Sequence, residues 1–142
     1  MRSNLLLSTL YSLLSTCFLF FSSLVFAQDQ TVPPVSSQDL VQQAWAASGQ
    51  GDLSKIEELV GQCVTLYGKQ AKEQEKQLTG FPQRGQEEQY QALNSVATCL
   101  FIRAEALMNA GKAEEAVVKF QEIMDEYPWA QAWDPRGWYW SV

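Results

Sequence analysis

The chain has 142 residues with 16 acidic and 10 basic side chains, no histidine, and a formal net charge of −6 at pH 7. This length predicts a single domain. An acidic protein is repelled by phosphate backbones, so the composition argues against nucleic-acid binding. The lack of histidine excludes Ser-His-Asp and Cys-His catalytic arrangements and histidine metal ligands. The glycines are isolated and form no phosphate-binding loop, so the sequence predicts no cofactor and no metal.

The first 27 residues differ in character from the rest. Arg2 gives a small positive start, residues 5–26 are apolar and uncharged, and Ala27 is followed at once by polar residues. This pattern predicts a signal peptide that is cleaved near Ala27, and therefore an exported protein, periplasmic or secreted. The alternative is an uncleaved membrane anchor, because residues 5–26 are long enough to span a bilayer. In that case the anchor would be the chain's contact with the membrane.

Residues 28–37 are expected to form a flexible linker, because paired prolines keep the backbone extended. A helical domain is predicted for residues 38–142. Ser36 and Asp39 resemble a capping box at the start of its first helix, and Asp52 can cap the second. Together these helices form a predicted hairpin over residues 38–77.

A second hairpin is predicted for residues 86–127, after a turn rich in glycine and proline at residues 79–85. Apolar residues recur at steps of three and four along both of its helices, and Gly111 separates them. The expected fold is all-α, with about four helices in two antiparallel hairpins and a short aromatic tail.

The segment from residue 100 to residue 128 resembles a tetratricopeptide repeat. Leu100 and Arg103 depart from the family, which often has Trp and Leu there. The resemblance implies a small exported helical-repeat protein whose groove binds a protein or peptide. Six residues fall at the family's positions: Ala104, Leu107, Gly111, Ala116, Phe120 and Pro128.

A fainter copy of this pattern lies 60 residues upstream, where Gly51 aligns with Gly111. Two repeats are fewer than such stacks usually need, so a further source of stability is expected. The alignment places Leu40, Ala44, Ala47, Ile56 and Val60 on Leu100, Ala104, Leu107, Ala116 and Phe120.

Cys63 and Cys99 each lie 18 residues from Phe81, near the centre of the middle turn. In an antiparallel hairpin, equal distances from the turn give equal heights, so the two thiols are expected to face each other. An exported protein favours a disulfide between them. The alternative is a pair of buried free thiols. Two cysteines at this separation do not make a zinc site.

The tail, residues 128–142, contains four of the five tryptophans. Asp134-Pro135-Arg136-Gly137 fits a type I turn, so the tail is expected to fold back onto the last hairpin. We interpret it as a cap on the exposed end of the stack. The alternatives are an anchor for a partner protein or a stacking platform for sugar rings. The candidate contact residues are Trp129, Trp133, Arg136, Trp138, Tyr139 and Trp140.

The predicted function is that of a non-catalytic adaptor or scaffold that binds an unidentified protein or peptide. The runner-up is a carbohydrate- or cell-wall-associated accessory protein that binds glycans through the tail. A distant third is a glycoside hydrolase, because Asp125, Glu126 and Asp134 lie near the tail and such enzymes use paired carboxylates.

Overall fold

The computed structural model describes residues 35–142. The predicted signal peptide of residues 1–27, the alternative anchor of residues 5–26 and residues 28–34 of the linker lie outside this part. Within residues 35–142, no helix combines the length and the apolar character needed to span a bilayer.

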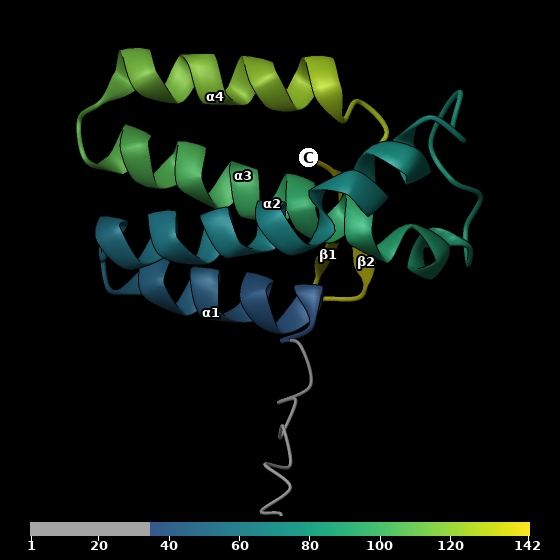
Figure 1. Ribbon diagram of the computed structural model, residues 1–142, viewed down its shortest axis with the longest axis horizontal. Helices are drawn as coiled ribbons and strands as arrows, with labels where there is room; N and C mark the ends of the chain where they lie inside the picture. The colour runs from purple at the N-terminus through teal and green to yellow at the C-terminus, as the bar shows by residue number, and fades with distance from the viewer. Residues whose placement is uncertain (1–34) are drawn as a thin grey trace, which may run out of the picture. The chain divides into compact units, whose positions relative to one another are not determined.

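The described chain is mainly helical and ends in two short strands (Figure 1). This confirms the expected all-α fold with a short tail. The middle turn leads through a 3-10 helix, η1, directly into the third α-helix. The elements are α1 (Ser37–Gly49), α2 (Leu53–Glu75), η1 (Glu87–Tyr90), α3 (Gln91–Asn109), α4 (Ala113–Glu126), β1 (Gln131–Asp134) and β2 (Trp138–Ser141).

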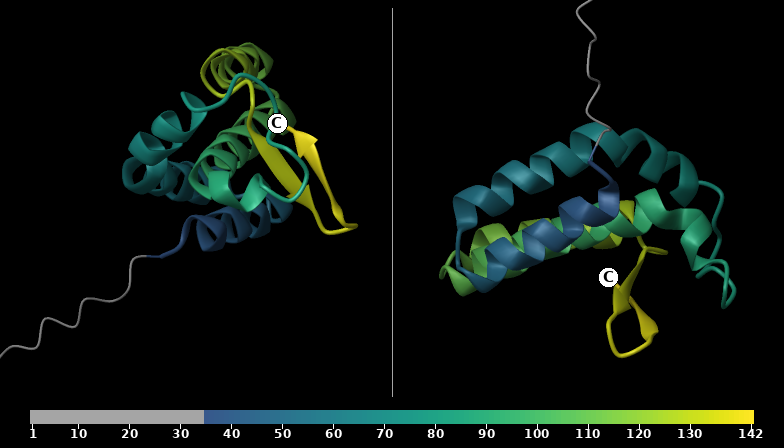
Figure 2. Two further views of the ribbon diagram at one scale, coloured as in Figure 1. Left: turned by 90° about the vertical axis from the view of Figure 1, so that its right-hand side faces the viewer. Right: turned by 90° about the horizontal axis from the view of Figure 1, so that it is seen from below.

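Helix α3 lies at the centre of the unit and contacts α1, α2, α4 and β1. Figure 2 shows α2 on one side of α3 and the two strands on the other side. The burial of α3 reflects this position, because eleven of its residues are buried. Its two long sides therefore have different neighbours.

The starts of α1 and α2 follow from their capping residues. The Ser36 hydroxyl accepts a hydrogen bond from the Asp39 amide at 3.1 Å and donates one to the Asp39 carboxylate at 2.7 Å. The Asp52 carboxylate accepts from the Lys55 amide at 3.0 Å. Each of these bonds satisfies an amide that the first helical turn leaves without a partner.

The two hairpins turn in the same way at Gly51 and Gly111. Both glycines have positive φ, 69° and 77°, which favours glycine because it has no Cβ. After α3, the Lys112 amide donates to the Leu107 carbonyl and the Gly111 amide to the Met108 carbonyl. The same pair of bonds follows α1 at the equivalent positions. This is the Schellman arrangement, which satisfies the last carbonyls of a helix.

Four of the five residue pairs in the 60-residue alignment are buried at both positions, whereas Val60 is buried and its counterpart Phe120 is only partly buried. Leu40 and Leu100 are buried, as are Ala44 and Ala104. Ala47 and Leu107 are buried as well, and so are Ile56 and Ala116. Small alanines at the centre of each hairpin allow its two helices to approach closely. The two hairpins thus share a packing pattern as well as a turn.

Cys63 of α2 and Cys99 of α3 meet in the seam between the two longest helices. Both are fully buried, and their side chains are hydrogen-bonded to each other. The hydrogen bond from Cys99 lowers the pKa of the Cys63 thiol, while the same bond, burial and the Cys63 charge raise the pKa of Cys99. Both are free thiols in this structure. The disulfide remains a prediction.

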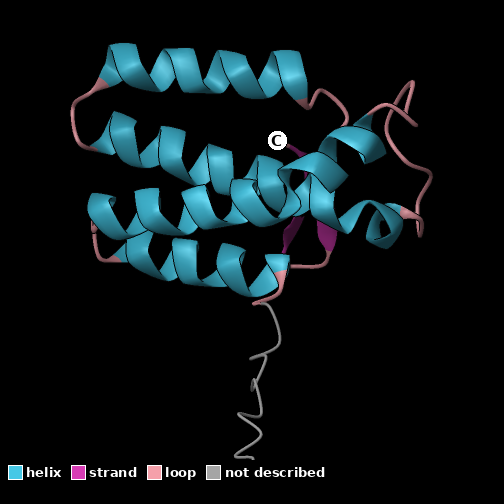
Figure 3. Ribbon diagram, viewed as in Figure 1, coloured by secondary structure: helices cyan, strands magenta, loops and turns pink. Residues whose placement is uncertain are grey.

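The tail forms an antiparallel β-hairpin (Figure 3). Asp134 pairs with Trp138 across a loop of three residues, and the Gly137 amide donates to the Asp134 carbonyl at 2.9 Å. Gly137 has φ 106°, as expected where a type I turn is followed by a bulge. The predicted reversal at residues 134–137 is therefore present, within a strand pair that the sequence did not predict.

Candidate binding pocket

One face of the β-hairpin packs on the helices. Ala130 and Ala132 are buried, and the ring of Trp140 meets Phe101 of α3 edge-on, with 5.2 Å between ring centroids. Phe101 also contacts Trp45 of α1 and Phe120 of α4. Trp140 thus joins an aromatic cluster that links three helices to the tail.

Trp129 precedes the strands and packs elsewhere. Its ring meets Phe81 of the middle turn edge-on, with 5.5 Å between centroids. This contact fastens the loop between α2 and η1 to the start of the tail. Of the predicted contact residues, Trp129 and Trp140 therefore pack against other parts of the chain and help to hold the tail in place.

Trp138 and Arg136 lie together at the tip of the hairpin. The Arg136 guanidinium stacks over the Trp138 ring, 4.4 Å from its centroid, and bonds the Asp134 carboxylate at 2.8 Å. This hydrogen bonding lowers the pKa of Asp134 to about 2, so the carboxylate is charged at neutral pH. One face of the Trp138 ring is covered by this arrangement.

Trp133 and Tyr139 form a pair across the two strands. Their ring centroids are 5.1 Å apart, with an angle of 63° between the ring planes. Trp133 is 57% exposed. The two rings are tilted and do not form the coplanar row that a sugar-stacking platform would need.

The tail covers one side of α3 and leaves the outer face of α4 open. Strand β1 contacts α3, whereas Val117, Val118 and Met124 on α4 are each more than half exposed. The predicted fold-back onto the last hairpin is present through Phe101. The tail packs beside α3, where it helps to enclose a pocket.

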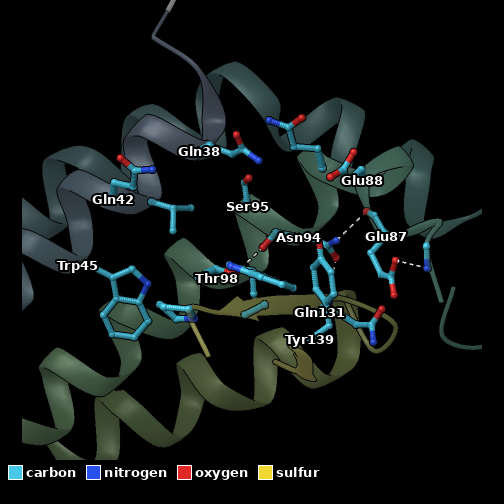
Figure 4. A pocket seen from close by; sticks show the side chains of 16 residues that line it. Gln38, Gln42, Trp45, Glu87, Glu88, Asn94, Ser95, Thr98, Gln131 and Tyr139 are labelled. Carbon is cyan, nitrogen blue, oxygen red and sulfur yellow. Dashed lines mark hydrogen bonds between the residues drawn. The ribbon is translucent and has the colours of Figure 1, made fainter. Parts of the chain in front are cut away.

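This pocket has a volume of about 590 Å³ and lies between α1, α3 and the β-hairpin (Figure 4). Each helix contributes four residues at spacings of three and four, which place them on one helical face. The hairpin and η1 close the remaining sides. The helical residues are Gln38, Val41, Gln42 and Trp45 of α1 and Gln91, Asn94, Ser95 and Thr98 of α3.

Asn94 holds the pocket together. Its side-chain amide donates to the Glu87 carbonyl of η1 at 3.1 Å, and its side-chain oxygen accepts from the Gln131 amide of β1 at 2.8 Å. Thr98 donates to the Asn94 carbonyl one turn along the helix. A single side chain therefore joins α3, η1 and the tail.

The pocket presents uncharged polar groups and aromatic rings. Gln38, Gln42 and Gln91 are exposed, and each side-chain amide offers both donors and an acceptor. The side-chain oxygen of Gln131 is buried without a hydrogen-bond partner in the described chain. Trp45, Trp133 and Tyr139 supply flat apolar surfaces. Such a mixture suits a ligand with alternating polar and apolar groups.

Of the pocket residues, Trp133 and Tyr139 were predicted as contact residues from the sequence, whereas the glutamine-rich helical faces were not. The signal was the recurrence of uncharged polar residues at 38 and 42 and again at 91, 94, 95 and 98. Because these residues are polar, the sequence alone predicts that they face solvent. Only the docking of the tail turns them into the walls of a pocket.

The carboxylates considered for a glycoside hydrolase do not line this pocket. Asp134 is paired with Arg136, Glu126 with Lys72, and the Asp125 carboxylate accepts from Gln121. Within residues 35–142, no group of three or more Cys, Asp or Glu side chains is placed to hold a metal ion.

Comparison with known proteins gave no match to any family model, curated protein or solved structure. The tetratricopeptide resemblance therefore remains a prediction from the residues that suggest it.

Proposed function

We propose that this chain is an exported, non-catalytic binding module that holds a segment of a partner protein in the pocket between α1, α3 and the β-hairpin. The observation behind this proposal is that helices from two different hairpins each present uncharged polar side chains to one pocket, which the tail helps to enclose. Because α1, α3 and the β-hairpin each form a wall of the pocket, an extended peptide can contact all three.

The chemistry of the walls supports a peptide as the ligand. A peptide backbone alternates N–H donors and C=O acceptors, and the amides of Gln38, Gln42 and Gln91 can bond to both. Trp45 and Trp133 offer apolar surface for side chains between them. The volume of about 590 Å³ gives room for a few residues of such a segment.

Glycan binding is the second candidate, because the pocket combines exposed aromatic rings with side-chain amides. Trp133 and Trp45 are 57% and 40% exposed at its walls. The geometry favours it less, since Trp133 and Tyr139 are tilted and Arg136 covers one face of Trp138. A sugar would have to enter the pocket and could not lie flat across the tail.

Site-specific photo-crosslinking in cells that export the protein tests the proposal. A crosslinking amino acid is placed at Gln42 or Trp133 in the pocket, and at Val117 on the outer face of α4 as the matched exposed control. We expect one shared protein adduct from both pocket positions and none from position 117. The same adduct from all three positions, or no protein adduct from the pocket, would contradict the proposal.

A further inference from the structure

The pocket has two chemically different ends. Figure 4 shows Trp45 and Gln42 at one end and Glu87 with Tyr139 at the other. Glu88 lines the same acidic end. Burial and the charges of Glu87 and Glu88 raise the pKa of the Tyr139 phenol, so the field of these carboxylates reaches the ring.

No cation balances this charge from within the pocket. Among residues 35–142, none of the nine lysine and arginine side chains lines it. Arg84 precedes the pocket residue Gly85 without lining the pocket itself. Arg136, the basic residue of the tail, is hydrogen-bonded to Asp134 and stacks over the Trp138 ring. The acidic end is therefore open to a positive group from outside.

The acidic end offers carboxylate acceptors, and the Glu87 carboxylate is held there by a hydrogen bond from the Gly85 amide at 2.6 Å. Glu88 lines the same end and is exposed. Ammonium and guanidinium groups donate only, so they complement such a set.

Two other places in the chain show the same combination of cation, ring and carboxylate. Lys72 lies 4.3 Å from the Tyr127 ring centroid and is paired with Glu126. Arg136 lies over Trp138 and is paired with Asp134. At the acidic end of the pocket, Tyr139 and the two glutamates supply a ring and carboxylates of the same kind.

We propose that the partner segment contains a lysine or arginine whose charged head lies at the acidic end of the pocket, between Glu87, Glu88 and the Tyr139 ring. This inference rests on the proposed function, since it names the chemical class of the segment that the pocket holds. The remainder of the segment runs along the glutamine-lined walls toward Trp45.

The test uses purified protein and labelled peptide pools with randomised flanks around one fixed central residue. The fixed residue is arginine or citrulline, which has nearly the same shape without the charge. Binding is measured by fluorescence anisotropy at low and high ionic strength. We expect the arginine pool to bind about fivefold more tightly at low salt, with a smaller difference at high salt.

Two substitutions locate the effect. Glu88→Gln should remove most of the preference for arginine over citrulline, because it removes one charge at the acidic end. Glu114→Gln on α4 makes the same change in net charge outside the pocket, so it should keep the preference. Circular dichroism of both variants verifies that each is folded.

The two proposals fail in different ways. Equal binding of both pools, together with weaker binding after Trp133→Ala, would overturn the cationic segment and leave peptide binding in place. A preference for arginine over citrulline that persists in Glu88→Gln would also overturn the cationic segment and leave peptide binding in place. If no pool binds in a way that depends on Trp133, the proposed function itself is overturned.

Discussion

The two sides of α3 differ in what they contact and in what they leave open. Toward α2, the helix forms a closed apolar seam in which Cys99 meets Cys63 with no exposed surface. Toward α1 and the tail, it presents Gln91, Asn94 and Ser95 to a pocket. The first side contributes burial and hence stability. The second is held in place by the hydrogen bonds of Asn94 together with the aromatic contacts of Phe101.

Two tyrosines reflect the same contrast. Tyr127 is buried. Burial, together with the charges of nearby acidic groups and of Cys63, raises the pKa of Tyr127 to about 12. Tyr139 is partly exposed on the pocket side, with a pKa also raised by burial and by Glu87 and Glu88. The buried seam and the pocket thus lie on opposite faces of one helix, so stability and the proposed binding can be perturbed separately.

The largest expected effect is on the seam side. Ile56 of α2 is fully buried, so Ile56→Ala should lower the free energy of unfolding by about 2–5 kcal/mol through lost burial and a cavity. Leu66→Ala on the same helix is the matched control, because Leu66 is 48% exposed, and it should cost well under about 1 kcal/mol. Urea unfolding measures both. Equal losses would show that the seam is not the source of stability.

The next effect concerns the cysteine pair. If Cys63 and Cys99 are joined in the exported protein, reduction should lower the free energy of unfolding by about 3 kcal/mol, because the bridge restricts the unfolded chain. Thiol counting on protein purified without reductant should find neither cysteine free. Two titratable thiols after denaturation would refute the disulfide and favour the alternative of two buried thiols.

A smaller loss is expected where the tail is fastened. Asn94→Ala removes the bonds to Glu87 and Gln131, so it should cost about 1–3 kcal/mol and loosen the hairpin. Gln91→Ala changes the neighbouring pocket residue of the same helix and should leave stability nearly unchanged. Tryptophan fluorescence and urea unfolding report both effects. If Asn94→Ala leaves the tryptophan fluorescence unchanged, the apolar contacts of Trp140 are enough to hold the hairpin in place.

The smallest effect is a pH dependence on the seam side. Because the pKa of Tyr127 is about 12 in the folded protein and about 10 in an unfolded chain, folding favours its neutral form. This stability is present below about pH 10 and is lost as the pH rises toward about 12. Tyr127→Phe should flatten that part of the curve. An identical alkaline decline in both proteins would assign the effect to other groups.

Much of the helical part could be predicted from the sequence, because local signals agree with the final packing. Gly111, Asp52 and the spacing from Ala104 to Phe120 each determine a turn, a cap or a buried face by short-range chemistry. The height of Cys63 opposite Cys99 followed from counting along an antiparallel pair. The turn, the cap and the buried face depend on neighbours within a few residues, whereas the height of the cysteines depends on the antiparallel pairing of two helices.

The tail and the pocket could not be predicted in the same way. Strands of four residues are too short to show a period, and β1 is fixed by distant contacts such as that between Gln131 and Asn94. Gln38 and Gln91 line a pocket only because the hairpin packs beside α3. Their sequence pattern has no feature that distinguishes a pocket wall from a solvated surface.

The most direct test of the account is a map of where a peptide binds. Backbone amide chemical shifts of the protein are recorded by NMR as the arginine-containing peptide that binds most tightly is added. If the peptide binds in the pocket, the largest changes should fall on the pocket faces of α1 and α3 and on β1, with little change around Cys63 in the α2 seam. Changes concentrated on the outer face of α4, at Val117 and Met124, would contradict it.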